Sequence, residues 1–481
     1  MTPASIVWFR QDLRLQDHPA LDAAIKQGGP VVPLYIWAPD EEDQGGPGGT
    51  SRWWLHHSLA SLDGSLRKMN SCLIVRRGQS LATLKRLIRE TGAKSVFWNR
   101  CYEPMIADRD KRIESELAKD GVTVRIFNGS LFHEPEAIKT KVGEPYKVFT
   151  PFWRACLSLG DPAEPLPAPR KISAPMTWPG SESLESLGLL PKVDRPGGIR
   201  RAWEPSEKGA AREMKRFLAE SVMDYASGRD RPDRQGTSHL SPYLHHGEIS
   251  PRQVWHAVMR HEQLDNQPGM IRGSQAYLRQ IYWREFAYHL LHHFPHTVSR
   301  PLREVFMGFP WRMDRKGLRA WKQGRTGYPA VDAAMRELWS TGWMHNRMRM
   351  VVASFLTKDL LIDWREGARW FWDTLVDADL ANNTFGWQWT AGCGADAAPF
   401  FRIFNPVMQG EKFDPEGRYV RRWIPELREL PDRFIHKPWE APDDMMQAAG
   451  VSLGETYPKR TVDHKVAKYR ALDGYQRIKM K

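Results

Sequence analysis

Five short apolar segments alternate with helical patterns over the first 130 residues, and this alternation restricts the possible folds more than any other feature. The apolar segments are residues 5–10, 31–37, 72–76, 95–99 and 122–127, and the clearest helical patterns are residues 52–62, 81–89 and 107–119. Strands that alternate with helices in this way form a parallel, doubly wound sheet, whose ligands bind beyond the C-terminal ends of the strands. No G-x-G-x-x-G motif follows the first strand, so we predict no nicotinamide site.

The pattern changes twice further along the chain. Residues 159–205 hold nine prolines, a density that blocks helix interiors and favours extended chain. From residue 206 onward the periodicity is helical, in the segments 207–225, 250–260, 273–293, 331–339, 341–362 and 367–376. We therefore predict an α/β domain over residues 1–130, a proline-rich connector over 131–205 and an all-α domain over 206–481.

The charge of the chain points to a polyanionic partner. The 481 residues carry a formal net charge of +13, which is typical of proteins that bind nucleic acid, although a membrane surface or solubility alone would also fit. The four cysteines are scattered without metal-ligand spacing, which favours a reducing compartment and predicts no metal site. No apolar run has the length of a membrane span, and the first residues enter a strand directly, so we expect no signal peptide and a cytoplasmic protein.

Residues 377–406 combine acids, amides, small residues and the tryptophans Trp387 and Trp389. Such a mixture suits a buried, flat ligand with polar edges better than an apolar core. A buried carboxylate such as Asp377 needs a partner, and Arg347 and Arg349 lie about thirty residues upstream. Each residue alone would also fit an ordinary capped helix end.

Two further segments of the helical domain carry candidate binding groups. The turn at residues 236–241, Gly-Thr-Ser-His-Leu-Ser, precedes a helical region, where hydroxyls and free N–H groups form either an anion-binding nest or a helix cap. Helical spacing places Gln280, Trp283 and Arg284 on one face, which is able to read a base edge, stack on a base and hold a phosphate. A helix–helix contact is the alternative for this face.

Nine motifs in order make the chain resemble the DNA photolyase and cryptochrome family over essentially its whole length. They are Trp8-Phe-Arg-x-Asp-Leu-Arg14, Gly236-Thr-Ser-x-Leu-Ser241, Trp283-Arg-Glu-Phe286, Thr326-Gly-Tyr-Pro329, Gly342-Trp-Met-His-Asn-Arg347, Asp363-Trp-Arg365, Asp377-x-Asp379, Trp387-Gln-Trp389 and Phe401-Arg-Ile-Phe-Asn-Pro406. Residues 36–42 and 51–54 resemble the class III photolyases and the plant cryptochromes in particular.

The resemblance implies a site for FAD in the helical domain, with Arg349 paired to Asp377 and Asn383 facing the flavin N5. The implied cofactor-binding residues are Tyr225, Thr237, Ser238, His239, Leu240, Ser241, Arg349, Asp377, Ala378, Asp379 and Asn383. It also implies that Trp387, Trp364 and Trp311 relay electrons to the flavin during photoreduction. The chain holds 21 tryptophans, so other routes stay open.

The implied activity is light-driven repair of cyclobutane pyrimidine dimers, by electron transfer from excited, reduced FAD to a lesion flipped out of DNA. Gln280, Trp283, Asn346, Met350 and Trp389 would line the lesion pocket. Arg229, Arg284, Arg347, Arg402 and Gln409 would contact the DNA backbone. The expected partner is UV-damaged DNA, single- or double-stranded and of any sequence, and we expect a monomer without membrane attachment.

Departures from family patterns define the alternatives. Gln280 stands where many bacterial photolyases have Glu, and the segment after His345 lacks the second histidine of the (6-4) photolyases, so the cyclobutane dimer is the favoured lesion and a (6-4) product the alternative. Asn383 stands where plant cryptochromes carry Asp, which disfavours a photoreceptor without repair activity. A redox flavoprotein and a non-enzymatic DNA-binding protein are the rivals from other classes.

The chain also lacks the Asn-Glu pair of the usual folate site, so we expect an antenna near Trp37, with methenyltetrahydrofolate preferred over 8-hydroxy-deazaflavin.

Overall fold

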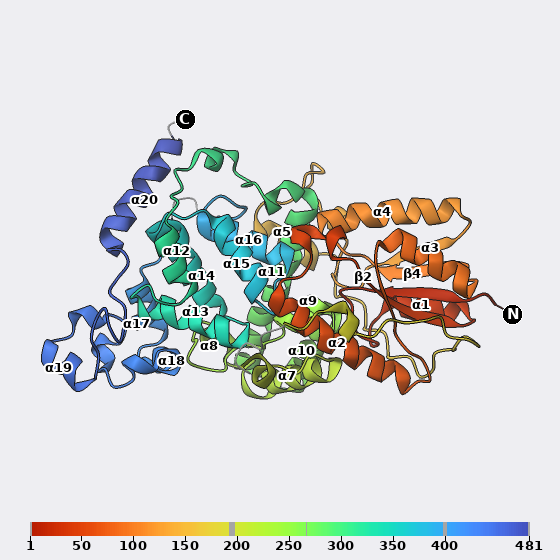
Figure 1. Ribbon diagram of the computed structural model, residues 1–481, viewed down its shortest axis with the longest axis horizontal. Helices are drawn as coiled ribbons and strands as arrows, with labels where there is room; N and C mark the ends of the chain where they lie inside the picture. The colour runs from red at the N-terminus through yellow and green to blue at the C-terminus, as the bar shows by residue number, and fades with distance from the viewer. Residues whose placement is uncertain (1, 192–197, 266, 398–401, 480–481) are drawn as a thin grey trace.

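The N-terminal part of the chain is a parallel sheet of the predicted kind. The structure is a computed structural model that describes residues 2–191, 198–265, 267–397 and 402–479. Within these residues the strands pair in parallel in the order β3-β2-β1-β4-β5, the doubly wound order. They are β1 (Ser5–Phe9), β2 (Val31–Trp37), β3 (Ile74–Arg77), β4 (Ser95–Asn99) and β5 (Thr123–Phe127). Figure 1 shows the sheet at one end of the molecule and the helical domain at the other.

Alternating side chains of the strands bury two different faces of this sheet, as the period of two requires. Val7 and Phe9 pack towards α1 (Pro19–Gln27) and α2 (Gly49–Arg67). Ile6 and Trp8 pack into a second cluster with α3 (Ser80–Thr91) and α4 (Pro104–Lys119). Because both faces are covered, the central strands read as continuous apolar runs in the sequence.

The loop after β1 joins the sheet to the helical domain. Arg14 is fully buried in this loop, and its guanidinium donates hydrogen bonds to the carbonyl oxygens of Asp17, Gly129 and Gly247. The backbone N–H of Leu13 also donates to the carbonyl of His246 at 3.1 Å. The position at which other doubly wound folds bind a dinucleotide is therefore partly taken up by contacts between the two parts of this chain.

The connector packs onto the helical domain through a helix that the proline pattern did not predict. This helix, α5 (Phe149–Leu157), places Phe149 and Phe152 in a cluster with Phe286 of α11 (Pro268–His293). Prolines at 162–179 follow it, and this stretch is extended as expected. The helices from 198 onward are α6 (Gly198–Ala202), α7 (Glu207–Glu220), α8 (Tyr225–Gly228), α9 (Ser241–His246), α10 (Pro251–Leu264), α11, α12 (Arg315–Lys322), α13 (Pro329–Thr341), α14 (Asn346–Ser354), α15 (Trp364–Thr374), α16 (Leu380–Ala391), α17 (Pro406–Phe413), α18 (Arg418–Trp423), α19 (Asp443–Ala448) and α20 (His464–Lys479).

The single helix predicted over residues 341–362 was wrong. Gly342 ends α13 in the left-handed conformation with φ of 71°, and the chain then turns before α14 begins at Asn346. The ring Nδ1 of His345 accepts the N–H of Arg347 and caps the new helix. A π-helical turn (Phe355–Asp359) ends it. The segment 342–345 is therefore a loop between two helices, which lets it reach the candidate site.

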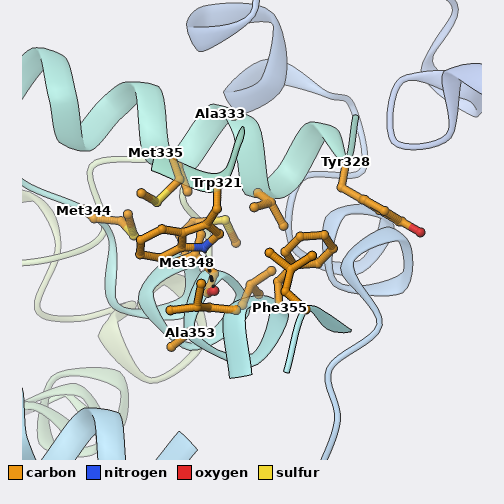
Figure 2. Packing of buried hydrophobic residues seen from close by; sticks show 14 of the residues in the cluster. Trp321, Tyr328, Ala333, Met335, Met344, Met348, Ala353 and Phe355 are labelled. Atoms are coloured by element: carbon orange, nitrogen blue, oxygen red, sulfur yellow. Dashed lines mark hydrogen bonds between the residues drawn. The ribbon is translucent and has the colours of Figure 1, made fainter. Parts of the chain in front are cut away.

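Trp321 lies at the centre of the largest apolar cluster of the helical domain. Its indole is fully buried among Met335 of α13, Met344 of the loop that follows and Met348 of α14 (Figure 2). The indole N–H donates to the carbonyl of Val352 at 3.0 Å, so the buried donor is satisfied. None of the helices in the described ranges is long and apolar enough to cross a membrane.

Candidate functional site

Three loops that lie far apart in the sequence meet in the helical domain. The ring of His239, from the turn at 236–241, stacks on Trp343 with 4.4 Å between centroids. The indole N–H of Trp343 donates to the hydroxyl of Ser241 at 3.3 Å. The third loop joins through Val376, whose N–H donates to the carbonyl of Gly342 at 2.8 Å. The predicted cofactor segments are therefore adjacent in space.

Arg349 and Asp377 form the ion pair that the resemblance implied. The guanidinium Nη2 of Arg349 lies 3.0 and 2.8 Å from the two carboxylate oxygens of Asp377. The carboxylate side chain is 3% exposed and that of the arginine 25% exposed. The charge of Asp377 is compensated inside the protein while the guanidinium still reaches solvent, so this prediction is confirmed.

Asp379 is held ionised beside this pair. Burial alone would raise its pKa, but the imidazole of His245, the positive charge of Arg284 and a hydrogen bond from Tyr288 together bring the pKa below its usual value. The hydroxyl of Tyr288 donates to the carboxylate at 2.5 Å. The other carboxylate oxygen accepts the N–H of Asn382 at 2.8 Å and so caps α16. Asp379 therefore fixes the start of the helix that carries Asn383.

Two neutral histidines line the same region. Burial lowers the pKa of His239 to about 4 and that of His345 to about 3. Since Nδ1 of His345 accepts a backbone N–H, its Nε2 carries the proton, yet this buried atom has no acceptor among the described residues. A buried donor without an acceptor costs about 1–3 kcal/mol, and a bound polar group would remove that cost.

These residues suit FAD by their chemistry. Hydroxyls and backbone groups of the 236–241 turn, the Arg349 guanidinium and the unpartnered His345 donor could together serve the anionic and polar edges of a flavin dinucleotide. Tyr225 is buried nearby on α8, where burial raises the pKa of its phenol to about 12, and it therefore stays neutral. Thr237 and Ser238 lie in the turn, whereas Leu240 and Ala378 are buried in the surrounding core.

Asn383 and Trp387 lie one helical turn apart on α16 and both face α15. The side-chain amide of Asn383 donates to the carbonyl of Ala368 at 3.1 Å. The ring of Trp387 lies edge-on to Phe371, with 5.0 Å between centroids, and covers Gly367 so closely that an added Cβ would lie 2.0 Å from the indole. The helix pair α15–α16 thus sets the position of both predicted residues.

The three tryptophans of the predicted relay differ in their surroundings. Trp364 is buried and Trp311 is half-buried against Phe309. In the described part of the chain, the ring of Trp387 has two aromatic neighbours, Phe371 and Trp321, and Trp364 is not one of them. The ring centroids of Trp387 and Trp321 are 6.2 Å apart. The order Trp387, Trp364, Trp311 therefore stays a prediction, and Trp321 is a second indole beside the first member.

The residues predicted to line the lesion pocket come from three helices. Gln280 and Trp283 lie on α11, Asn346 and Met350 on α14, and Trp389 on α16, which packs against both other helices. All are half-buried except Asn346, which is exposed.

Trp283 already has a stacking partner. Its ring lies parallel to Phe149 at 3.6 Å, and Phe385 lies 5.7 Å away. Gln280 donates to the carbonyl of Ala276 within its own helix. Only the faces of these side chains that are not taken up in this way are open to a ligand.

The residues predicted to contact the DNA backbone are not equally accessible. Arg402 is exposed, and Arg229 and Gln409 are half-buried. Arg347 forms an ion pair with Asp230 at 2.9 Å. Arg284 is buried and donates to the carbonyl of Ser130 at 2.7 Å, because α11 directs it towards the end of the sheet domain. We therefore no longer place Arg284 on the surface that meets DNA, and Phe401 of the ninth motif lies outside the described residues.

Trp37 is 4% exposed and packs in the core of the sheet domain, so its ring offers little surface to an antenna. Tyr288, His245, Trp321 and Glu103 were not among the predicted site residues. Tyr288 lies one turn after Arg284 on α11, so helical spacing could have identified it. Glu103 comes from the loop after β4, where burial and the charge of Asp379 raise its pKa. The sequence gives no signal for this contact, since the two residues belong to different domains.

Comparison with known proteins finds similarity along nearly the whole chain. Residues 5–170 match the family model described as DNA photolyase, and residues 277–477 match the FAD binding domain of DNA photolyase. A deoxyribodipyrimidine photo-lyase of Agrobacterium fabrum is 50% identical over 99% of this chain and 98% of its own length. Cryptochrome-1 of Arabidopsis thaliana is 43% identical over 97% of this chain and 69% of its own.

A solved structure shares the same architecture. The crystal structure of a class III photolyase from Agrobacterium tumefaciens superposes with a TM-score of 0.96 at 50% identity, covering 100% of this chain and 98% of its own.

Proposed function

The chain belongs to the DNA photolyase and cryptochrome family, and from this we propose how its site performs light-driven repair of cyclobutane pyrimidine dimers. The chain is a deoxyribodipyrimidine photo-lyase that binds FAD. One observation supports the assignment most: the 236–241 turn, the Arg349–Asp377 pair and Asn383 lie around one site. The chain is also 50% identical to a photolyase over 98% of that protein's length. When bound and reduced, FAD supplies the light-excited electron that opens the dimer's cyclobutane ring.

The residues of this chain hold the reactants and exclude water. We assign the cofactor's anionic part to the 236–241 turn and Arg349, because hydroxyls, N–H groups and a cation converge there. Asn383 is held by its hydrogen bond to the carbonyl of Ala368, and its amide would serve the polar edge of the flavin ring. Ring opening needs no general acid or base, which fits a site whose two buried histidines stay neutral.

We assign the lesion to the surface formed by α11, α14 and α16. Trp283, Met350 and Trp389 supply stacking and apolar contact, worth about 1–3 kcal/mol per base. Gln280 and Asn346 supply amides that both donate and accept, as thymine edges require. A dimer pairs poorly in the duplex, so flipping it out costs less than flipping an intact base. Phosphate contacts from Arg229, Arg347 and Arg402 would make binding independent of sequence.

The test uses a duplex that carries one cyclobutane dimer. Purified, reduced protein should restore the dimer to two pyrimidines under blue light and leave it unchanged in darkness. A (6-4) photoproduct in the same duplex should stay unrepaired. Equal loss of the dimer in light and darkness would contradict the proposal. Light-induced reduction of the flavin without any repair would instead support the cryptochrome alternative.

Further properties belong to the same proposal. We propose that the protein acts as a monomer in the cytoplasm on single- or double-stranded DNA, with a second, light-harvesting chromophore. A folate remains the preferred chromophore, and a deazaflavin is the alternative. An absorption spectrum of the protein as purified, together with light scattering, would check both points.

A further inference from the structure

A buried phenyl ring lies directly against Trp283, one of the indoles that we assign to the lesion. Phe149 of the connector helix α5 is fully buried, and its ring is parallel to that of Trp283, with 3.6 Å between centroids and an interplanar angle of 8°. Trp283 itself is half-buried. The protein therefore covers one face of this indole with a flat ring, and a base would stack on the surface that stays exposed.

The ring of Phe149 is itself held from several sides. Phe286 of α11 lies edge-on to it, with 5.8 Å between centroids, and Trp153 lies parallel to it one turn further along α5. The guanidinium of Arg279 lies 5.4 Å from the Phe149 centroid and 4.7 Å from that of Trp153. A ring packed in this way keeps one orientation, so it gives Trp283 a rigid support.

The start of α5 is also tied to the segment that follows α16. The backbone N–H of Asp396 donates to the carbonyl of Lys147 at 3.2 Å. Burial raises the pKa of the Asp396 carboxyl, and a hydrogen bond from the backbone N–H of Phe149 partly offsets this effect. Asp396 has a left-handed backbone with φ of 49°, which the surrounding contacts must maintain. Helix α5 therefore has a fixed position relative to α16, the helix that carries Trp389.

We propose that Phe149 is a positioning residue that sets how strongly the protein prefers a dimer to intact DNA. The inference rests on the proposed function, because it requires the lesion to stack on Trp283. Without the ring of Phe149 the indole would have space to tilt, and binding of a dimer would have to restrict it again at an entropic cost. Phosphate contacts act on DNA of any sequence, so their contribution would stay the same.

Phe152 provides an internal comparison on the same helix. It is 2% exposed and belongs to the same apolar cluster as Phe149. Its ring packs on Phe286 and His289, with 5.2 and 5.0 Å between centroids. A substitution of Phe152 removes an equally buried ring while the stack of Phe149 on Trp283 remains. The two positions should therefore have similar effects on stability and different effects on recognition of the dimer.

The test measures binding by fluorescence anisotropy in darkness, with a duplex that carries one cyclobutane dimer and with the same duplex intact. Phe149→Leu should weaken binding of the dimer duplex by about tenfold and leave binding of the intact duplex unchanged. Phe152→Leu should lower the Tm to a similar extent but keep the wild-type preference for the dimer. Reduced Phe149→Leu at saturating concentration should repair the bound dimer under blue light at the wild-type rate.

A double-mutant cycle gives a second readout that a purely structural role would not produce. In a Trp283→Ala background, Phe149→Leu should cause no further loss of affinity for the dimer duplex, because the ring that Phe149 positions is absent. Phe149→Met, which is also apolar and unbranched, replaces Phe149→Leu in every measurement if the leucine variant does not fold.

The possible outcomes separate this inference from the proposed function. Wild-type preference for the dimer in the Phe149 variant, additive losses in the cycle, or an equal loss of preference in Phe152→Leu would overturn the inference. If the wild-type protein repairs the dimer and the Phe149 variant keeps the full preference, only the inference fails. A wild-type protein that neither prefers nor repairs the dimer would contradict the proposed function itself.

Discussion

At the residue scale, the Arg349–Asp377 pair shows how a buried charge is tolerated in this site. The carboxylate is almost fully buried, whereas a quarter of the arginine side chain is exposed. Removal of one partner leaves the other uncompensated, and the loss is larger when the buried partner is left alone. The pair also borders the loops that we assign to the flavin, so it links stability to cofactor retention.

Replacement of Asp377 by Asn should therefore reduce both properties. We expect a loss of about 3 kcal/mol in unfolding free energy, the lower end for a broken buried pair because the arginine reaches solvent. The fraction of protein that retains FAD after gel filtration should fall as well. Asp473→Asn, in an exposed pair with Arg477, is the control. Wild-type flavin retention in Asp377→Asn would contradict the assigned role.

Replacement of Trp387 should affect photoreduction of the flavin but not repair of the dimer. Its indole is buried beside Phe371 and Trp321. Trp387→Phe keeps an aromatic ring in place but raises the energy needed to oxidise it, so photoreduction of oxidised FAD should slow strongly. Repair by protein reduced chemically beforehand should stay near wild type. Unchanged photoreduction would remove Trp387 from the electron path.

At the scale of elements, the contact between α15 and α16 depends on one glycine. Gly367 has an ordinary helical conformation, but a Cβ there would lie 2.0 Å from Cη2 of Trp387. The absence of a side chain lets the outer edge of the indole approach the helix backbone closely. Packing, and not backbone flexibility, is therefore the reason for glycine at this position.

Gly367→Ala should displace Trp387 and cost about 1–3 kcal/mol through overpacking. Thermal unfolding and tryptophan fluorescence would measure the two effects. Gly386→Ala on α16 has open space around the new methyl group, so it should be neutral or stabilising by up to about 1 kcal/mol. An equal Tm for Gly367→Ala and wild type would show that the interface can relax around the methyl group.

The contact between α11 and the connector should depend on pH through Glu285. Burial raises the pKa of this carboxyl from 4.5 to about 8, and its oxygen accepts the backbone N–H of Phe132 at 3.0 Å. Between these two values the folded protein keeps a proton that the unfolded chain has lost. The free energy of unfolding is therefore unaffected by this group below pH 4.5. It falls as the pH rises from there towards 8, by at most about 1.4 kcal/mol per pH unit.

Urea unfolding of Glu285→Gln between about pH 5 and pH 8 should show a smaller decline than wild type, because the amide does not titrate. Glu429→Gln, an exposed substitution on the same domain, should follow the wild-type curve. Parallel curves for Glu285→Gln and wild type would assign the pH dependence to other buried carboxyls.

At the scale of the whole molecule, the excess of positive charge should govern the affinity for DNA. The net charge of +13 attracts DNA of any sequence, and exposed cations such as Arg402 would replace counterions of the phosphates. Binding should weaken as salt rises, whereas discrimination between damaged and intact DNA should depend on the stacking residues.

Arg402→Ala should lower affinity for damaged and intact duplexes alike and reduce the slope of log K against log salt by about one. Fluorescence anisotropy at several salt concentrations would measure this. Arg89→Ala, an exposed change on α3 of the sheet domain, should leave the slope unchanged. If Arg402→Ala changes only the affinity for damaged DNA, the residue contacts the lesion and not the backbone.

The sequence by itself determined the order of elements, the parallel sheet and the segments that form the candidate site. Periodicity reports which face of an element is buried, and the motifs stand at fixed positions along the chain. The end of α13 at Gly342 was not predicted from the sequence, because a left-handed glycine between two helical patterns leaves the periodicity almost unchanged.

Only the tertiary structure decided which side chains meet. The inward direction of Arg284, the approach of Trp321 to Trp387 and the parallel rings of Trp339 and Trp370 depend on how separate helices pack. Local sequence fixes the face on which a residue lies but not the neighbour that covers that face. Such contacts between distant segments arise from the packing of the whole chain.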